Sequence, residues 1–308
     1  MPLRAKKVYP AQFVYEKPAS IEEAIALLDR YKEDARPLAG GMSLVPLMKL
    51  RLIQPQYIVD ISKIKELRGI RKTSSHVEIG AITTNSEIQD TDWLLSEFPL
   101  IRDTVHLIGD VQVRNLGTIG GNISDADPSL DWLPTLIALE SDIVIRGVKG
   151  ERTVAAGDFL VEPYTTVLAP DELVTSIRIP LPKGKTQGAH IKIERRTGDF
   201  AVAIAACQLT LDGSGKCSKA RIVIGAVSPL PVRAVSTERE LAGKVLNEST
   251  IASAAEKSKN DIEGADILSD VKATAEYRTA MVPVIVKRSI ISAVKGQSTE
   301  GKSVAHRD

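Results

Sequence analysis

The hydrophobic and polar positions near the start of the chain predict a helix. Ser20 and Glu23 have the spacing of a capping box, in which side chains satisfy backbone N–H groups of the first helical turn. Apolar residues follow at helical spacing, at positions Ile21, Ala24, Ile25, Leu28 and Tyr31. We therefore expect a helix over about residues 20–33.

The segment after this helix is expected to form a strand, a glycine turn, a short helix and a second strand. Apolar residues 37–39 lead into Gly40-Gly41, and Ser43 opens a second apolar segment over residues 44–52. Residues 57–61 have the composition of a buried strand. Together these segments predict a βαβ-like unit across residues 10–62.

A second α/β lobe is expected from residue 63 onward. Strands are predicted at residues 77–81, 143–145 and 174–179, with a helix at 93–108 and a second glycine turn at 117–122. The proline- and glycine-containing stretch 180–185 is the best linker candidate. The first domain is therefore predicted to cover residues 1–182, with lobes of about 1–62 and 63–182.

The remainder of the chain predicts a small α+β domain over residues 186–296, followed by a polar tail at 297–308. Two apolar segments flank the turn residues 212–215 and indicate a β-hairpin. The predicted strands cover residues 201–211 and 217–227, and the predicted helices cover 236–244, 249–259 and 277–294. The whole chain is thus expected to have an α+β fold.

Charge and hydropathy exclude two classes of partner. Lysine and arginine total 40 against 39 acidic residues, so the net charge of +1 gives no basic surplus for binding a nucleic acid. No apolar run approaches the roughly 20 residues that cross a bilayer, so no membrane insertion is expected. No signal-peptide core follows the first residues, and a cytoplasmic protein is predicted.

The candidate metal ligands are too few and too scattered to predict a metal site. The chain has two cysteines, Cys207 and Cys217, and its four histidines at positions 76, 106, 190 and 306 lack ligand spacing. Zinc, haem and iron–sulfur sites need several thiolates or imidazoles that converge on one point. We expect no metal and no catalytic residue in this chain, so any redox role requires an organic cofactor.

The two glycine pairs, Gly40-Gly41 and Gly120-Gly121, are candidate phosphate-binding turns. Without a Cβ atom, the backbone lets a phosphate approach main-chain N–H groups. Each pair is expected to follow a strand-like segment, and Ser43 or Asn122 comes after it. The repetition favours a ligand with two phosphates, although neither segment matches the Rossmann or P-loop pattern.

Three aspartates follow the second glycine pair, and the sequence leaves their role open. Asp125, Asp127 and Asp131 could bind ribose or ribityl hydroxyls. For Asp125 and Asp127, a solvated turn that caps a helix at Trp132 is equally compatible with the sequence.

With the motifs Ala39-Gly40-Gly41-Met42-Ser43-Leu44 and Thr118-Ile119-Gly120-Gly121-Asn122, the chain resembles the FAD-binding medium subunits of molybdenum hydroxylases. This family includes xanthine dehydrogenase, aerobic carbon monoxide dehydrogenase and archaeal glyceraldehyde oxidoreductase. The likeness covers nearly the whole chain, including residues 35–41, 48–52, 118–131, 195–201 and 276–278. It implies a two-lobed FAD-binding domain of the vanillyl-alcohol-oxidase (PCMH) type and a small flavoprotein C-terminal domain.

The resemblance also implies roles for individual residues. Residues 39–44 and 118–122 are expected to hold the FAD pyrophosphate, and Asp131 to bond to cofactor hydroxyls. Phe200 occupies the place of a tyrosine beside the isoalloxazine ring, and Lys192 matches a lysine in the strand leading there, although a surface lysine is the alternative. Met42 stands where carbon monoxide dehydrogenases have histidine, which weakens the case for carbon monoxide as substrate.

By this resemblance, the chain is an electron-transfer subunit with non-covalent FAD. The expected partners are a small [2Fe–2S] subunit and a large molybdopterin subunit, in a dimer of heterotrimers, and an aldehyde such as glyceraldehyde is the expected substrate. One alternative is a self-sufficient flavin oxidoreductase on the same scaffold, for which the chain offers no convincing acid–base set. A non-catalytic nucleotide-binding protein is the other.

Overall fold

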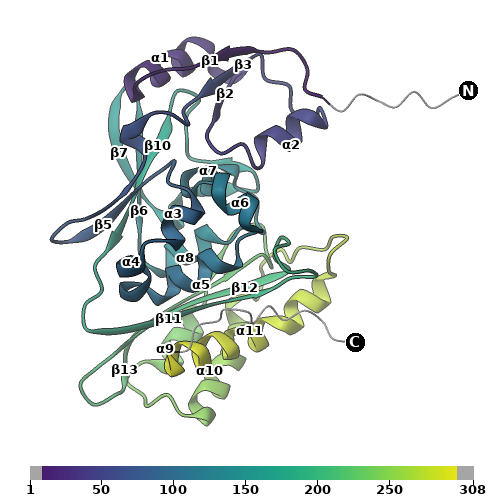
Figure 1. Ribbon diagram of the computed structural model, residues 1–308. Helices are drawn as coiled ribbons and strands as arrows, with labels where there is room; N and C mark the ends of the chain where they lie inside the picture. The colour runs from purple at the N-terminus through teal and green to yellow at the C-terminus, as the bar shows by residue number, and fades with distance from the viewer. Residues whose placement is uncertain (1–8, 297–308) are drawn as a thin grey trace, which may run out of the picture.

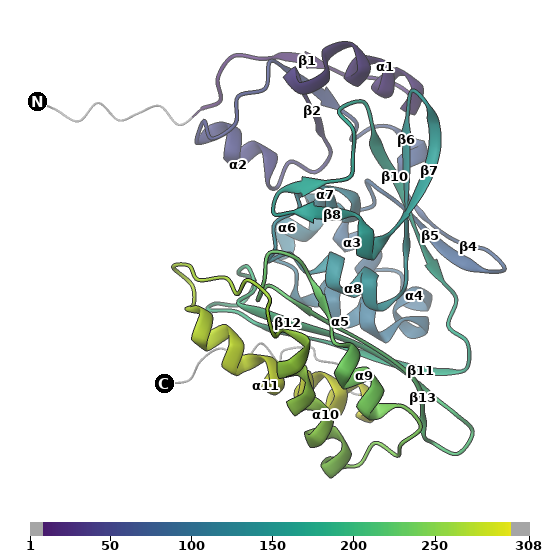
Figure 2. The same ribbon diagram turned by 180° about the vertical axis from the view of Figure 1, so that it is seen from behind.

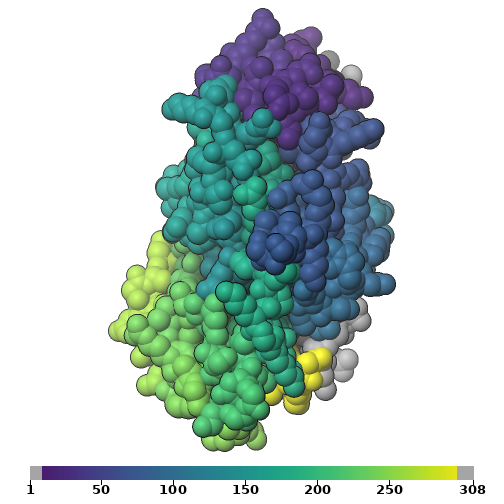
Figure 3. Space-filling model, turned by 90° about the vertical axis from the view of Figure 1, so that its left-hand side faces the viewer, coloured from purple at the N-terminus to yellow at the C-terminus, as the bar shows by residue number. Residues whose placement is uncertain are grey.

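The computed structural model describes residues 9–296. The predicted polar tail 297–308 and the first eight residues lie outside this range. The molecule is elongated, with the N-terminal lobe at one end, a central lobe in the middle and the C-terminal sheet and helices at the other end (Figure 1 and Figure 3). The mixed α+β class predicted from the sequence is confirmed.

The N-terminal lobe is a three-stranded parallel sheet with one helix packed on it. The strand order is β1-β3-β2, and α1 follows β1 and packs against β2 and β3. The Ser20 side chain accepts a hydrogen bond from the Glu23 N–H, so the predicted helix start is confirmed. The elements are β1 (Val14–Glu16), α1 (Ile21–Tyr31), β2 (Ala35–Leu38), α2 (Leu44–Lys49) and β3 (Tyr57–Asp60).

The central lobe has a five-stranded sheet, β4-β5-β10-β6-β7, packed against six short helices. The strands are β4 (Ile70–Lys72), β5 (His76–Gly80), β6 (Asp142–Gly147), β7 (Gly150–Ala155) and β10 (Leu173–Pro180). The helices are α3 (Asn85–Gln89), α4 (Asp92–Glu97), α5 (Pro99–Leu107), α6 (Val111–Leu116), α7 (Ile119–Asp125) and α8 (Trp132–Ala138). A small ribbon of β8 (Leu160–Glu162) and β9 (Thr165–Thr166) lies beside α7 in Figure 2.

Two predictions for this lobe are wrong. The single helix expected at residues 93–108 is two helices, α4 and α5, because Pro99 disfavours a helical conformation of Phe98. The second glycine pair does not follow a strand and is not a free turn. It follows α6 and lies in the first turn of α7, where Thr118 caps the helix by accepting from the Gly121 N–H.

The C-terminal part is a four-stranded antiparallel sheet, β11-β12-β13-β14, buried on both faces. Ala206 and Val223 pack into the core of the central lobe, whereas Cys207 and Ile222 pack beneath the C-terminal helices. The predicted hairpin is confirmed, and Lys192 lies in a strand, β11, as the resemblance implied. The elements are β11 (Lys185–Ile193), β12 (Ala203–Leu211), β13 (Cys217–Gly225), β14 (Val232–Arg233), α9 (Val235–Leu241), α10 (Glu248–Asp261) and α11 (Ala275–Lys295).

Arg278 holds the last helix against this sheet. It is fully buried near the start of α11, and its guanidinium donates to the backbone carbonyls of Val202 and Ala226. A third hydrogen bond, 2.8 Å long, reaches the Asp270 carboxylate. Each carbonyl would lose its donor in the interior if the guanidinium were removed.

We expect Arg278→Met to lower the free energy of unfolding by about 3 kcal/mol, because buried acceptors would be left unpaired. Urea denaturation measures this change. Arg239→Met, on the exposed side of α9, is the matched control and should change it by less than about 0.5 kcal/mol. Equal effects of the two substitutions would contradict the structural role of Arg278.

Candidate cofactor-binding site

The two glycine segments, far apart in the sequence, are in contact. A Cβ atom added to Gly40 would lie 1.8 Å from the carbonyl oxygen of Leu116, the last residue of α6. A Cβ atom on Gly117 would lie 3.7 Å from the Met42 side chain. The backbones of the N-terminal lobe and the central lobe are therefore in direct contact here, with no side chain between them.

The first segment, residues 39–44, presents unpaired main-chain N–H groups. Gly41 has φ +71°, a conformation that favours glycine, and the chain turns there from β2 into α2. Within the described part of the chain, the N–H groups of residues 40–44 donate no hydrogen bond. Successive N–H groups of this kind in a turn form an anion-binding concavity.

The second segment, residues 118–122, differs because its N–H groups are already used. Ile119 donates to the Thr83 carbonyl, Gly120 donates to the Ala81 carbonyl at 2.8 Å, and Gly121 donates to the Thr118 hydroxyl at 3.1 Å. Asn122 has a buried side-chain oxygen without a hydrogen-bond partner. In this segment, the exposed backbone of Gly121 and the Asn122 side-chain amide are available to a ligand, but there is no series of free N–H groups.

Ser43 of the first segment and Asp125 of α7 also interact. Burial raises the pKa of Asp125, at the end of α7, and a hydrogen bond with the Ser43 side chain partly opposes that rise. The capping role left open for Asp125 and Asp127 is wrong, because neither side chain caps the helix at Trp132. Asp127 instead accepts from the Ser129 N–H and from the Tyr164 hydroxyl.

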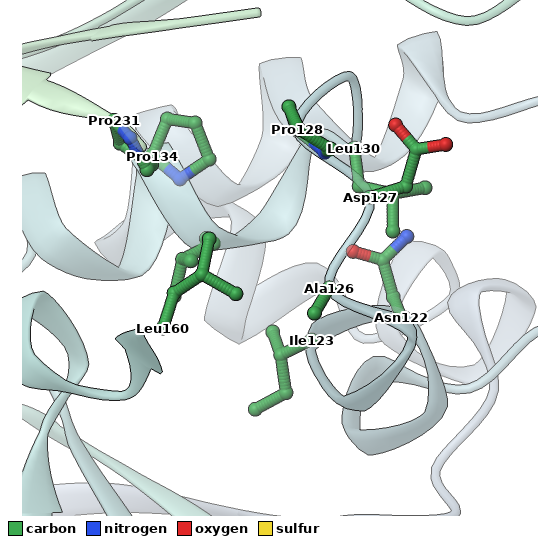
Figure 4. Close-up of a pocket in the computed structure, with 10 residues that line it drawn as sticks. Asn122, Ile123, Ala126, Asp127, Pro128, Leu130, Pro134, Leu160 and Pro231 are labelled. Atoms are coloured by element: carbon green, nitrogen blue, oxygen red, sulfur yellow. The ribbon is translucent and has the colours of Figure 1, made fainter. Parts of the chain in front are cut away.

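A small, mostly apolar pocket lies beside α7 (Figure 4). Asn122 and Asp127 form its polar side, and the rest of its lining includes Leu160, Pro134 and Pro231. Pro231 comes from the C-terminal part, so the pocket lies where the central lobe meets that part. Nearby, partial desolvation and the Asp127 carboxylate raise the pKa of Tyr164, a residue that is 68% exposed, to about 12.

Asp131 and Lys192 are paired with each other across the boundary between the central lobe and β11. Their side chains are 6% and 2% exposed and form an ion pair of 3.0 Å. Burial alone would raise the pKa of Asp131, but Lys192 and His190 outweigh it and lower this pKa below its usual range. Lys192 is therefore not a surface lysine, and the Asp131 side chain makes no capping hydrogen bond to α8.

Phe200 lies on the loop after β11 and is 46% exposed. The Lys272 ammonium lies 4.6 Å from the centre of its ring. The same loop contacts the start of α6, because a Cβ atom on Gly198 would lie 2.9 Å from the Gly109 carbonyl oxygen. Phe200 thus offers an aromatic face at the surface, on a loop held against the central lobe.

Sequence reasoning missed two buried polar residues beside Lys192. His190 and Glu194 are 0% and 1% exposed; His190 lies on the same face of β11 as Lys192, and Glu194 directly follows the strand. The signal was present in the sequence, because these three polar residues alternate with Ile191 and Ile193 in the period-two pattern of a strand.

Within residues 9–296, no group of three or more His, Cys, Asp or Glu side chains could hold a metal ion. None of the helices in that same range is long and apolar enough to cross a membrane.

Comparison with known proteins identifies the family. Residues 11–182 match the family model of the FAD binding domain in molybdopterin dehydrogenase, and residues 189–293 match that of the CO dehydrogenase flavoprotein C-terminal domain. The chain belongs to the FAD-binding subunits of molybdenum hydroxylases. The resemblance inferred from the glycine motifs is thereby confirmed, as is FAD as the cofactor.

Named relatives span several members of this FAD-binding subunit family. The carbon monoxide dehydrogenase medium chain of Afipia carboxidovorans is 41% identical over 91% of this chain and 96% of the relative. The glyceraldehyde dehydrogenase medium chain of Sulfolobus acidocaldarius is 38% identical over 92% and 98%. A crystal structure of a Cu,Mo-CO dehydrogenase matches with TM-score 0.89 and 40% identity over 94% of this chain and 99% of that chain. The chain is thus the medium subunit of a multi-subunit oxidoreductase.

We expect Gly40→Ala to separate the two glycine segments, because the new methyl group would clash with the Leu116 carbonyl. The free energy of unfolding should fall by about 1–3 kcal/mol, and the purified protein should lose FAD. Gly157→Ala is the control, since a Cβ atom there meets nothing within 4 Å. If Gly40→Ala keeps the FAD content and stability of Gly157→Ala, the contact is not required.

Proposed function

We propose that the chain binds FAD non-covalently and transfers electrons from a [2Fe–2S] centre on a partner subunit to an external acceptor. The observation that carries this proposal is the row of free N–H groups at residues 40–44, held against the end of α6 and beside α7. When bound, FAD supplies the ability to exchange either one or two electrons. The chain's own residues supply binding and orientation.

The residues present fit a cofactor with two phosphates. The N–H groups of residues 40–44 can donate to phosphate oxygens, and the exposed Gly121 lets a phosphate approach α7 without steric hindrance. The Asn122 amide can donate to a phosphate or accept from a ribityl hydroxyl. The proposed phosphate-binding residues are Ala39, Gly40, Gly41, Met42, Ser43, Leu44, Thr118, Ile119, Gly120, Gly121 and Asn122.

Phe200 is the proposed contact for the isoalloxazine ring. Its half-exposed ring faces solvent and can pack against a flat aromatic ligand. The matched family models, which end at residue 182 and begin again at residue 189, support the proposed domains at 1–182 and 186–296. Location in the cytoplasm remains a prediction.

The proposed partners are a small [2Fe–2S] subunit and a large molybdopterin subunit, in a dimer of heterotrimers. An exposed apolar surface on the N-terminal lobe supports contact with another protein. Its residues are more than one-third exposed and comprise Tyr9, Phe13, Val14, Tyr15, Leu50 and Leu52. A hydrogen bond from Arg51 to the Tyr9 carbonyl joins the two segments that carry them.

An aldehyde such as glyceraldehyde is the proposed substrate of the complex. The 38% identity to a glyceraldehyde dehydrogenase medium chain supports this choice. So does Met42, which stands where the carbon monoxide enzymes are expected to have histidine. The identity to a carbon monoxide dehydrogenase medium chain is similar, at 41%.

We expect the isolated chain, loaded with FAD, to be reducible by dithionite but not by any aldehyde. Oxidation with oxygen from water needs a metal centre, and the described residues offer no ligand set for one. The assay follows flavin absorbance anaerobically, using a substrate that the complete complex is first shown to oxidise.

Bleaching by that substrate should appear only after the metal-containing partner subunits are added. Rapid bleaching in the isolated chain would contradict the electron-transfer role and favour a self-sufficient oxidoreductase. Bleaching by dithionite alone, with no response to substrate after reconstitution, would show that electrons do not pass through this subunit.

A further inference from the structure

A groove with a volume of about 420 Å³ lies between strand β13 and helix α9. These two elements are at the opposite end of the molecule from the N-terminal lobe (Figure 1). The lining of the groove includes four cationic side chains and one carboxylate, which belong to Lys219, Arg221, Arg233, Arg239 and Glu238. We call these five residues the cationic groove. None of them belongs to the proposed FAD site.

A buried carboxylate orients two of the arginines in this groove. Glu238 is 6% exposed, and Arg233 donates to it from Nε at 3.1 Å and from Nη2 at 2.7 Å. The same carboxylate lies 3.6 Å from Nη1 of Arg221. A guanidinium group has five N–H donors, so an arginine that is held along one edge keeps donors for a second anion. The side chains of Arg221 and Arg233 remain 23% and 44% exposed.

The charges at the groove do not balance. Glu140, which follows α8, pairs with Lys219 and with Arg221. Arg239 is exposed on α9, and within residues 9–296 its guanidinium has no hydrogen-bond or ion-pair partner. With Glu140 included, four cations face two carboxylates, which leaves an excess of two positive charges. A phosphate group carries about 1.5 to 2 negative charges at neutral pH, so its charge matches this excess.

The backbone of β13 adds a donor on the same side. The Ile222 N–H leaves the sheet and donates to the Glu238 carboxylate at 3.0 Å. In an antiparallel ladder, the N–H groups of residues two positions apart point to the same side. The Ala220 N–H therefore points away from β12, toward the groove that Ala220 lines. Backbone N–H groups together with arginines are well suited to bind phosphate oxygens.

The open edge of β13 is too short to pair with a peptide strand. At one end, β14 pairs with Val223 and Ile224. At the other end, the Cys217 N–H donates to the Lys244 carbonyl. Only residues 218–221 lie between these contacts, whereas strands usually have about five or six residues. The groove therefore favours a small anion over an added peptide.

We propose that the cationic groove binds a small molecule that carries a phosphate group. The phosphate oxygens accept hydrogen bonds from the three arginines and from the Ala220 N–H. Lys219 adds a positive charge at the rim. The groove is separate from both glycine segments, so this inference does not depend on the proposed electron-transfer role.

Isothermal titration calorimetry of the full chain with inorganic phosphate tests the site. Saturating FAD is present throughout, so that phosphate does not compete for the glycine segments. The wild type should bind one phosphate per chain. Arg239→Met removes the unpaired cation and its charge-assisted hydrogen bonds, so it should weaken phosphate binding about tenfold. The FAD content should stay unchanged.

Arg288→Met is the matched control. Arg288 is an exposed arginine on another C-terminal helix, α11, and it does not line the groove. This substitution changes the net charge by the same amount as Arg239→Met. It should leave the phosphate dissociation constant within about twofold of the wild type, because charges at the surface are screened by salt.

Four results would overturn the proposal. The first is no saturable binding by the wild type up to about 10 mM phosphate. The second is equal affinity of the two variants, because phosphate would then respond only to net charge. The third is loss of FAD from Arg239→Met, because the groove would then not be separate from the FAD site. The fourth is phosphate binding by the isolated chain that disappears in the complete complex, because the groove would then be an interface between subunits.

Discussion

The contact between Gly40 and the Leu116 carbonyl is the constraint on which the site depends. It brings the turn after β2 against the end of α6 with no side chain between them. Only then do the free N–H groups of residues 40–44 lie at the end of α6, where the chain continues into α7 and the exposed Gly121. A ligand that spans both segments therefore needs the N-terminal and central lobes to be closely apposed.

Helix α6 extends this constraint to the C-terminal part. Its first turn follows Gly109, which contacts Gly198, and its last residue contacts Gly40. Arg114 strengthens the first of these ends by donating to the carbonyls of Ile108 and Gly109. The C-terminal sheet packs on one face against the core of the central lobe and on the other against the core beneath the C-terminal helices. The Phe200 loop follows strand β11 of this sheet, so close packing on both faces fixes its position.

Sequence patterns predicted most elements because their signals are local. The Ser20 cap, the period of α1 and the hairpin turn at residues 212–215 need no tertiary information. The break between α4 and α5 could also have been found, since Pro99 marks it. Gly120-Gly121 misled the prediction because glycine usually indicates a turn, whereas here close packing against Ala81 requires glycine inside a helix.

The candidate site was only partly predictable for the same reason. The glycine motifs located both segments, but the sequence could not show that one has free N–H groups and the other does not. The pairing of Asp131 with Lys192 joins residues separated by 61 positions, and no local pattern specifies such a pair. The alternation of His190, Lys192 and Glu194 was the one signal available, and it would have predicted β11.

The most direct test of a site built for two phosphates compares binding of FAD and FMN to the purified chain. FMN has the same isoalloxazine ring but only one phosphate and no adenosine. The account predicts one FAD per chain and an FMN dissociation constant at least about 100-fold higher, since one phosphate would leave donors at residues 40–44 unpaired. Equal affinities for FAD and FMN, measured by flavin fluorescence, would contradict it.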